Sequence, residues 1–312
     1  MRTFKDYLLL FGKGLTMGGA DVVPGVSGGT IAFITGIYQE LIDSIKSINF
    51  NTLKLLFNGE FKVFWKSVNG NFLMVLFSGI AISLKSLASL MTYLMEAYPI
   101  QLWSFFLGLI LISSIVVLRQ INKGSFGVVI AGIIGLIVSY FITSLSPAQT
   151  SDSYLMIFLS GAIAICAMIL PGISGAFILL ILGKYQLVVG ALGNFELDII
   201  IVFILGALTG ILSFVRVISW LLHKYHNLAV ALLAGFMLGS VNKIWPWKQV
   251  IEYRLNRHGE QVPFIEENIL PTQYFDITGN SPLIIEAILY LAIGFFIVVA
   301  LEKIALSLKK KS

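Results

Sequence analysis

The chain has 312 residues, of which 57% are hydrophobic and only 12% are charged, and its mean hydropathy is +0.92. A soluble domain carries roughly 25% charged residues, so this chain cannot cover a water-facing surface and lipid must be its main solvent. Its net charge of +5 lies in short basic runs beside apolar segments, which indicates membrane orientation rather than nucleic-acid binding.

Taken in order, the apolar segments predict an all-α, polytopic membrane protein. Six of them are long enough to span a bilayer as unbroken helices, and two are interrupted. A basic stretch at 44–70 is typical of an interfacial amphipathic helix, and 245–280 forms the one sizeable loop. The full spans are 71–95, 101–118, 126–145, 199–222, 228–244 and 282–304.

The two interrupted segments, about 14–43 and 154–192, are each broken by a proline–glycine pair. The breaks are Pro24-Gly25 and Pro171-Gly172. Proline removes a backbone donor and glycine loosens the chain. Broken backbone at membrane depth is tolerated only inside protein or beside a watery cavity. These segments therefore predict discontinuous helices or re-entrant hairpins that face the interior.

An internal repeat relates the two breaks. PGVSGGTIAFITGIYQ (24–39) aligns without gaps to PGISGAFILLILGKYQ (171–186), and nine of the sixteen positions are identical. A weaker match continues through Gly79, Ser86 and Tyr98, which align with Gly206, Ser213 and Tyr225. The chain thus contains two related halves.

Lysines and arginines in short loops set the expected orientation. They place both termini in the cytoplasm and make the two halves run in opposite directions, which is the inverted repeat of secondary transporters. The expected division is a first repeat at 1–125, a linking helix at 126–145, a second repeat at 154–248, an extracytoplasmic loop at 249–281 and a C-terminal helix with a basic tail at 282–312.

Ser27 and Ser174 each stand after a break and before an apolar helical run, where a serine acts as N-cap. A half-helix that starts at membrane depth directs its positive end inward and favours an anion. We expect this anion to be a phosphate. The alternative is that each break only permits close helix packing. The residues assigned to the phosphate at these helix starts are Ser27, Gly28, Gly29, Thr30, Ser174 and Gly175.

Two cations, Lys85 and Arg216, lie well inside predicted spans and are near-equivalent in the repeat. An intramembrane charge is costly and usually functional, so we expect both to bind the phosphate. The alternatives are that Lys85 snorkels to the interface and that Arg216 forms a structural ion pair with Asp21. Asp21, just before the first break, is the candidate for coupling to a proton or a cation.

No other chemistry is apparent. The single cysteine, Cys166, excludes a cysteine-rich metal site, and the sequence has no HExxH pair, phosphate-binding loop or nucleophile elbow. We therefore expect no metal, no cofactor and no catalytic residue. The sequence assigns no oligomeric state.

The runs GLTMGGADVVPGVSGGTIAFITGIYQELI (14–42), ILPGISGAFILLILGKYQ (169–186) and GFMLGSVNKIWPW (235–247) closely resemble the polyprenyl-phosphate translocases of the PopT type, over nearly the whole chain. The resemblance implies recycling of undecaprenyl phosphate from the outer to the cytoplasmic leaflet of the bacterial plasma membrane. That lipid carries peptidoglycan and other envelope polymers.

Two other functions compete with this interpretation. The first is an undecaprenyl-pyrophosphate phosphatase, which would also have inverted repeats and PGxS motifs. That family is expected to have an arginine directly after the serine, where this chain has Gly28 and Gly175. The second is an ion-coupled carrier of a small soluble anion, which the same helix starts would serve.

Overall fold

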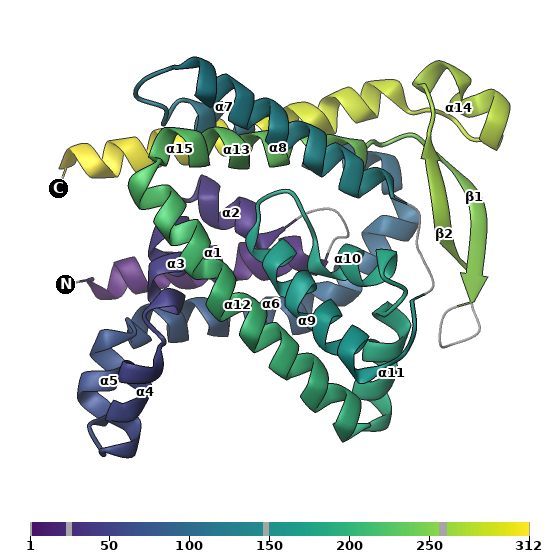
Figure 1. Cartoon of the computed structure of the whole chain (residues 1–312). Coiled ribbons are helices and arrows are strands. Elements are labelled where there is room, and N and C mark those ends of the chain that lie inside the picture. Colours follow the sequence, from purple (N-terminus) through teal and green to yellow (C-terminus); the bar gives the residue numbers. More distant parts are fainter. Residues whose placement is uncertain (1, 23–26, 146–149, 256–260, 312) are drawn as a thin grey trace.

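The computed structural model describes residues 2–22, 27–145, 150–255 and 261–311 and is built mostly of helices (Figure 1). Pro24 and Gly25 lie outside the described residues. The helices of the first half are α1 (Phe4–Val22), α2 (Gly28–Ile34), α3 (Tyr38–Lys46), α4 (Phe50–Phe57), α5 (Phe61–Ser67), α6 (Gly70–Ala97), α7 (Pro99–Leu118) and α8 (Phe126–Ser144).

The second half follows the same order. Its elements are α9 (Tyr154–Ile169), α10 (Gly175–Ile181), α11 (Tyr185–Asn194), α12 (Leu197–Lys224), α13 (His226–Gly239), the short η1 (Ser240–Asn242), β1 (Lys248–Leu255), β2 (Gln261–Asn268), α14 (Pro271–Thr278) and α15 (Ile284–Lys311). Each of the six predicted spans thus corresponds to a helix, with ends that differ by a few residues.

Two segments differ from the sequence-based prediction. The basic stretch at 44–70 is not one amphipathic helix, because Asn58 and Gly59 end α4 and the chain turns into α5. Gly59 has a φ of +77°, which a residue with a side chain rarely adopts. The long loop contains an antiparallel pair, β1 with β2, and the helix α14, so the chain is not purely α-helical.

Three helices among the described residues are long and apolar enough to cross a membrane, namely α7, α8 and α12. A fourth span results if α5 and α6, bent by 70° relative to each other, are counted as one. Protein buries 67% of the α7 window but only 22% of the α8 window and 17% of the α12 window. Therefore α7 lies in the interior, whereas α8 and α12 present apolar surface to lipid.

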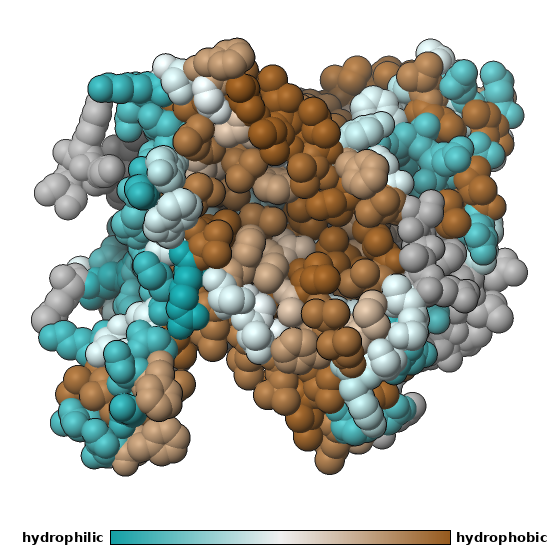
Figure 2. Space-filling model, viewed as in Figure 1, coloured by the Kyte–Doolittle hydropathy of each residue, from teal (hydrophilic) through white to brown (hydrophobic). Residues whose placement is uncertain are grey.

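Polar and apolar surfaces are separated along the molecule. Both chain ends and the α4–α5 pair lie at one end, and β1, β2 and α14 lie at the opposite end (Figure 1). In the space-filling view, hydrophobic residues cover most of the middle, and hydrophilic residues gather towards the two ends (Figure 2). This distribution fits a protein whose middle is immersed in hydrocarbon.

The helix pairs repeat between the halves. In the first half α1 packs against α6, and in the second half α9 packs against α12. Close contact depends on glycine at both crossings: a Cβ on Gly79 would lie 2.5 Å from the Phe11 oxygen, and a Cβ on Gly206 would lie 2.0 Å from the Phe158 oxygen. Phe11 and Phe158 are separated by the same 147 positions as the two PG motifs.

The remaining long helices pack across the halves. The fourth long helix of the first half, α8, packs against α13, and α15 packs against α7. The turns after the breaks also match, because Gly36 (φ +72°) and Gly183 (φ +67°) occupy equivalent positions. The two helices α6 and α12 both have 28 residues, and a residue with left-handed backbone precedes each of them.

Candidate functional site

The start of α2, just after the first break, meets the segment around the second break in the interior of the molecule. Ser27 begins α2, and its Oγ donates to the carbonyl oxygens of Met168 (3.0 Å) and Leu170 (3.3 Å), which lie at the end of α9. The same Oγ accepts from the backbone N–H of Gly29 at 3.1 Å. Ser27 is fully buried. One serine thus caps its own helix and joins the first half to the second.

A second cross-half bond lies next to the first. The backbone N–H of Gly172 donates to the Oγ1 of Thr30 at 2.9 Å, and Thr30 is also fully buried. Gly172 has a φ of +89°, and a Cβ there would lie 2.9 Å from the oxygen of Phe236. Thr30, which the sequence assigned only to phosphate, therefore has a structural bond as well.

The backbone at the start of α2 lies very close to the backbone at the end of α9. A Cβ on Gly29 would lie 2.6 Å from the oxygen of Ile169 in the other half. On the second break, Pro171, Ser174 and Gly175 are buried as well. The structure therefore brings Ser27, Gly29 and Thr30 against the segment that ends at Gly172. Ser174 and Gly175 are buried within the second half and, among the described residues, form no hydrogen bond to the first.

Asp21 occupies the start of α2. Its Oδ1 accepts from the backbone N–H of Gly28 at 2.6 Å, and a Cβ on Gly28 would lie 2.5 Å from Oδ2. The next two N–H groups are also bonded internally, that of Gly29 to the side chain of Ser27 and that of Thr30 to its carbonyl oxygen. The carboxylate of Asp21 thus stands where the sequence placed a phosphate, and it forms no ion pair with Arg216.

The two halves differ at their serines. Ser174 precedes α10 as Ser27 precedes α2, but its side chain makes no cap hydrogen bond. No carboxylate matches Asp21, because position 168, its repeat equivalent, is a methionine. The helix start at Ser27 is therefore more completely hydrogen-bonded by side chains than the helix start at Ser174.

Of the two predicted cations, only Arg216 has a described side chain. Lys85 is part of α6, and its side chain lies outside the described part of the chain. Arg216 is exposed on α12 and donates to the oxygen of Leu212, one turn earlier. Thr209 and Ser213 are exposed at helical spacing on the same side of α12. Arg216 thus continues a polar stripe on a helix that otherwise faces lipid.

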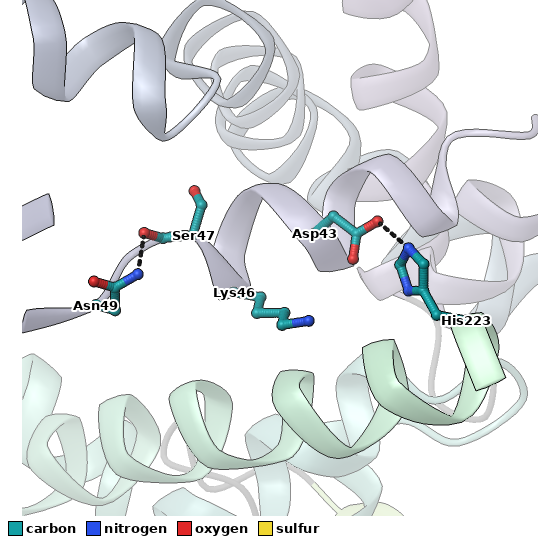
Figure 3. Close-up of a pocket in the computed structure, with 5 residues that line it drawn as sticks. All are labelled: Asp43, Lys46, Ser47, Asn49 and His223. Atoms are coloured by element: carbon teal, nitrogen blue, oxygen red, sulfur yellow. Dashed lines mark hydrogen bonds and ion pairs between the residues drawn. The ribbon is translucent and has the colours of Figure 1, made fainter. Parts of the chain in front are cut away.

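A polar cluster that the sequence did not predict joins α3 to α12 (Figure 3). The Oγ of Ser219 donates to Asp43 Oδ1 at 2.7 Å and accepts from Lys46 Nζ at 3.0 Å. The Nε2 of His223 lies 3.5 Å from Asp43 Oδ2. Asp43, Lys46 and His223 line an open pocket of about 390 Å³. His223 is exposed at the end of α12, one turn after Ser219, and the sequence gives no other signal for this cluster.

Metal chemistry has no candidate here. Among the described residues, no group of three His, Cys, Asp or Glu side chains could hold a metal ion. The contact between the halves is made of hydroxyls and backbone groups, and the α3–α12 contact adds the charged side chains of Asp43 and Lys46.

Taken together, broken apolar helices, long lipid-facing helices and a buried polar junction define a multi-pass membrane protein. A family model described as undecaprenyl phosphate translocase-like matches residues 17–262. A curated protein of Vibrio cholerae serotype O1, named polyprenyl-phosphate transporter, is 46% identical over 300 residues, covering 96% of this chain and 97% of that protein.

A protein of the same name from Staphylococcus aureus is 36% identical over 264 residues, covering 79% of this chain and 88% of that protein. This chain therefore belongs to the undecaprenyl phosphate translocase-like family. The names of its relatives indicate a transporter of a polyprenyl-phosphate lipid. No solved structure matches the chain.

Proposed function

We propose that this protein moves undecaprenyl phosphate from the outer to the cytoplasmic leaflet of a bacterial plasma membrane, and so returns the carrier of peptidoglycan and other envelope polymers. The names of the relatives support the lipid class. Both termini lie at the end that also holds α4 and α5, with Lys54, Lys62 and Lys66 (Figure 1). By the positive-inside rule we assign that end to the cytoplasm.

The two halves act as inverted repeats in this proposal. Matched helix pairs, matched glycine contacts and matched turns support the repeat. We include α8 in the first repeat and α15 in the second, because α8 packs on α13 as α15 packs on α7. Transporters of this architecture bind substrate between the repeats, near the middle of the bilayer.

The observation that carries the proposal is the buried contact between the two breaks. Ser27 and Thr30 of the first half bond to backbone atoms of the second half at 2.9–3.3 Å. A rocking motion of one repeat against the other must break and remake these bonds. Exchange of such bonds with a phosphate would open the site to one leaflet at a time, while the prenyl chain stays in the bilayer.

The phosphate is held in this mechanism by Arg216, Lys85 and the backbone N–H groups after Ser27 and Ser174. Arg216 and the exposed hydroxyls of α12 give the headgroup a polar route along an otherwise apolar helix. Arginine suits this role because its planar guanidinium binds phosphate through two parallel bonds.

Asp21 couples this binding to a second ion. Its carboxylate accepts from Gly28 N–H at 2.6 Å, so a phosphate reaches that group only when the carboxylate leaves or becomes neutral. Two anions at one helix start repel each other. Uptake of a proton or a cation by Asp21 would remove the repulsion and link translocation to an ion gradient.

The test is flipping by the purified chain in proteoliposomes. Undecaprenyl phosphate placed in the external leaflet should become inaccessible to an external phosphatase faster with protein than without it. Retention of the protein-free rate would refute the proposal. Release of inorganic phosphate from undecaprenyl pyrophosphate would identify a phosphatase, and uptake of inorganic phosphate without lipid flipping would identify a soluble-anion carrier.

A further inference from the structure

Two lysine side chains share one carboxylate at the end opposite the termini. Lys243 follows η1, Lys248 begins β1, and Glu266 belongs to the partner strand β2. The Nζ atoms of Lys243 and Lys248 lie 3.6 Å and 3.4 Å from the same oxygen, Glu266 Oε2. The side chain of Lys243 is 22% exposed, that of Lys248 8% and that of Glu266 26%. This group is called the outer lysine pair below.

Aromatic rings and a carbonyl complete the surroundings. The Nζ of Lys243 lies 4.9 Å from the ring centroid of Phe177, and the Nζ of Lys248 lies 4.3 Å from that of Trp103. Lys248 also donates to the carbonyl oxygen of Lys243 at 2.9 Å. The two ammonium groups are therefore fixed in position on rigid ring faces from α10 and α7.

The charges of this group do not balance. Two cations face one carboxylate in a partly buried site, where charges are screened less than at the surface. The pKa of Lys248 is lowered to about 8, mainly by burial; the charge of Glu266 opposes this change and the charge of Lys243 adds to it. The two ammonium groups repel each other, and a single carboxylate only partly neutralises them. A second negative charge at this site would reduce that repulsion.

We propose that the outer lysine pair is the entry site for the phosphate monoester headgroup of a lipid in the outer leaflet, and that Glu266 occupies this site until the phosphate displaces it. A phosphate monoester carries about −1.5 to −2 charges near pH 7, which matches two lysines better than one carboxylate does. This inference rests on the proposed function, because it supplies the outward-facing step of the same transport.

The location favours a lipid over a soluble anion. Trp245 and Trp247 lie beside the pair in sequence and contact each other edge to face, with ring centroids 5.5 Å apart. Such aromatic residues gather at the level of lipid headgroups. Phe177, under Lys243, lies on α10 directly after the second break. A headgroup that binds Lys243 therefore lies one side chain away from the element that we assign to the central site.

The experiment measures binding of undecaprenyl phosphate to the full-length chain in phosphatidylcholine nanodiscs by native mass spectrometry. All proteins carry Arg216→Ala, to weaken the central site. Lys243→Gln and Lys248→Gln each remove one cation, and Glu266→Gln removes the competing anion. The matched control is Lys224→Gln, because Lys224 also stacks on an aromatic ring, Trp220 at 5.7 Å, but lies at the end of α12.

Each lysine substitution should weaken binding about tenfold or more, as expected for loss of a hydrogen bond to a charged group. Glu266→Gln should strengthen binding, whereas Lys224→Gln should leave it unchanged. Unchanged affinity in both lysine variants would overturn the proposal. So would a Glu266→Gln protein that loses thermal stability without gaining affinity, because the three residues would then only fasten the β-hairpin.

Two further arms separate the sources of phosphate and the two proposals. Inorganic phosphate at equal concentration should not displace the lipid, and undecaprenol should not bind; effective competition by inorganic phosphate would identify a soluble-anion site and overturn the lipid assignment. Flipping is measured in parallel without Arg216→Ala. Normal flipping with unchanged binding in the lysine variants would refute only the entry site, and binding without flipping would refute only the transport function.

Discussion

Replacing Ser27 by alanine tests the junction between the halves. The change removes the donor to Met168 and Leu170 and the acceptor of Gly29 N–H, in a site with no exposed surface. A buried polar group left without its partner costs about 1–3 kcal/mol. Two of the three partners are affected in this way, because the Leu170 oxygen still accepts from the N–H of Ile173 at 3.4 Å. We therefore expect the free energy of unfolding to fall by about 2–4 kcal/mol, together with loss of flipping.

The repeat supplies the matched control. Ser174→Ala makes the same chemical change at the equivalent position, but Ser174 makes no side-chain cap. It should cost less than about 1 kcal/mol, the value of an ordinary hydrogen bond. Reversible unfolding in mixed micelles measures both variants. Equal losses in the two proteins would refute the claim that Ser27 holds the halves together.

Arg216→Ala should abolish flipping in proteoliposomes and Arg216→Lys should retain part of it, because the role requires charge; equal rates in the two variants would contradict it. Gly206→Ala puts a Cβ 2.0 Å from a carbonyl oxygen of α9 and should lower the melting temperature in detergent. Gly12→Ala, with nothing within 4 Å, is its control and should leave that temperature unchanged.

Burial lowers the pKa of Lys248 from 10.5 to about 8. Between pH 8 and 10.5 Lys248 is therefore more protonated in the unfolded chain than in the folded protein. The free energy of unfolding should consequently rise as the pH increases across that window. Binding of undecaprenyl phosphate to Arg216→Ala protein should weaken over the same range. The charged groups that act on Lys248 are Lys243 and Glu266. If neither the free energy of unfolding nor lipid binding changes with pH over this range, the assignment of a lowered pKa to Lys248 is refuted.

Much of the architecture could be predicted from the sequence, because apolar runs of span length have few alternatives in lipid. Each of the six predicted spans corresponds to a helix, although only three of these helices are by themselves long and apolar enough to cross a membrane among the described residues. The β-hairpin was not predicted: its strands (248–255 and 261–268) mix charged and aromatic residues without clean alternation. The division of 44–70 into two helices depends on the turn at Gly59, which cannot be inferred from the spacing of the charged residues in this stretch.

The candidate site was predictable in its parts but not in its bonds. The repeat identified Ser27 and Ser174 as equivalent, yet a sequence cannot say that only one of them caps its helix. Asp21 was predicted to be functional from its position before the break. Its bond to Gly28 could not be predicted, because it depends on how α1 and α2 are placed relative to each other. Asp43 and Lys248 gave no signal, since charged residues near helix ends and in loops are ordinary.

The proposed assignment of α8 to the first repeat and α15 to the second has a mechanical consequence. In this assignment each half contributes one helix that packs on an interior helix of the other half: α8 packs on α13, and α15 packs on α7. A rocking motion of one half against the other therefore has to be accommodated at these two helix contacts as well as at the Ser27 and Thr30 bonds. The α8–α13 and α15–α7 contacts would thus keep the two halves attached to each other while the bonds at the centre exchange.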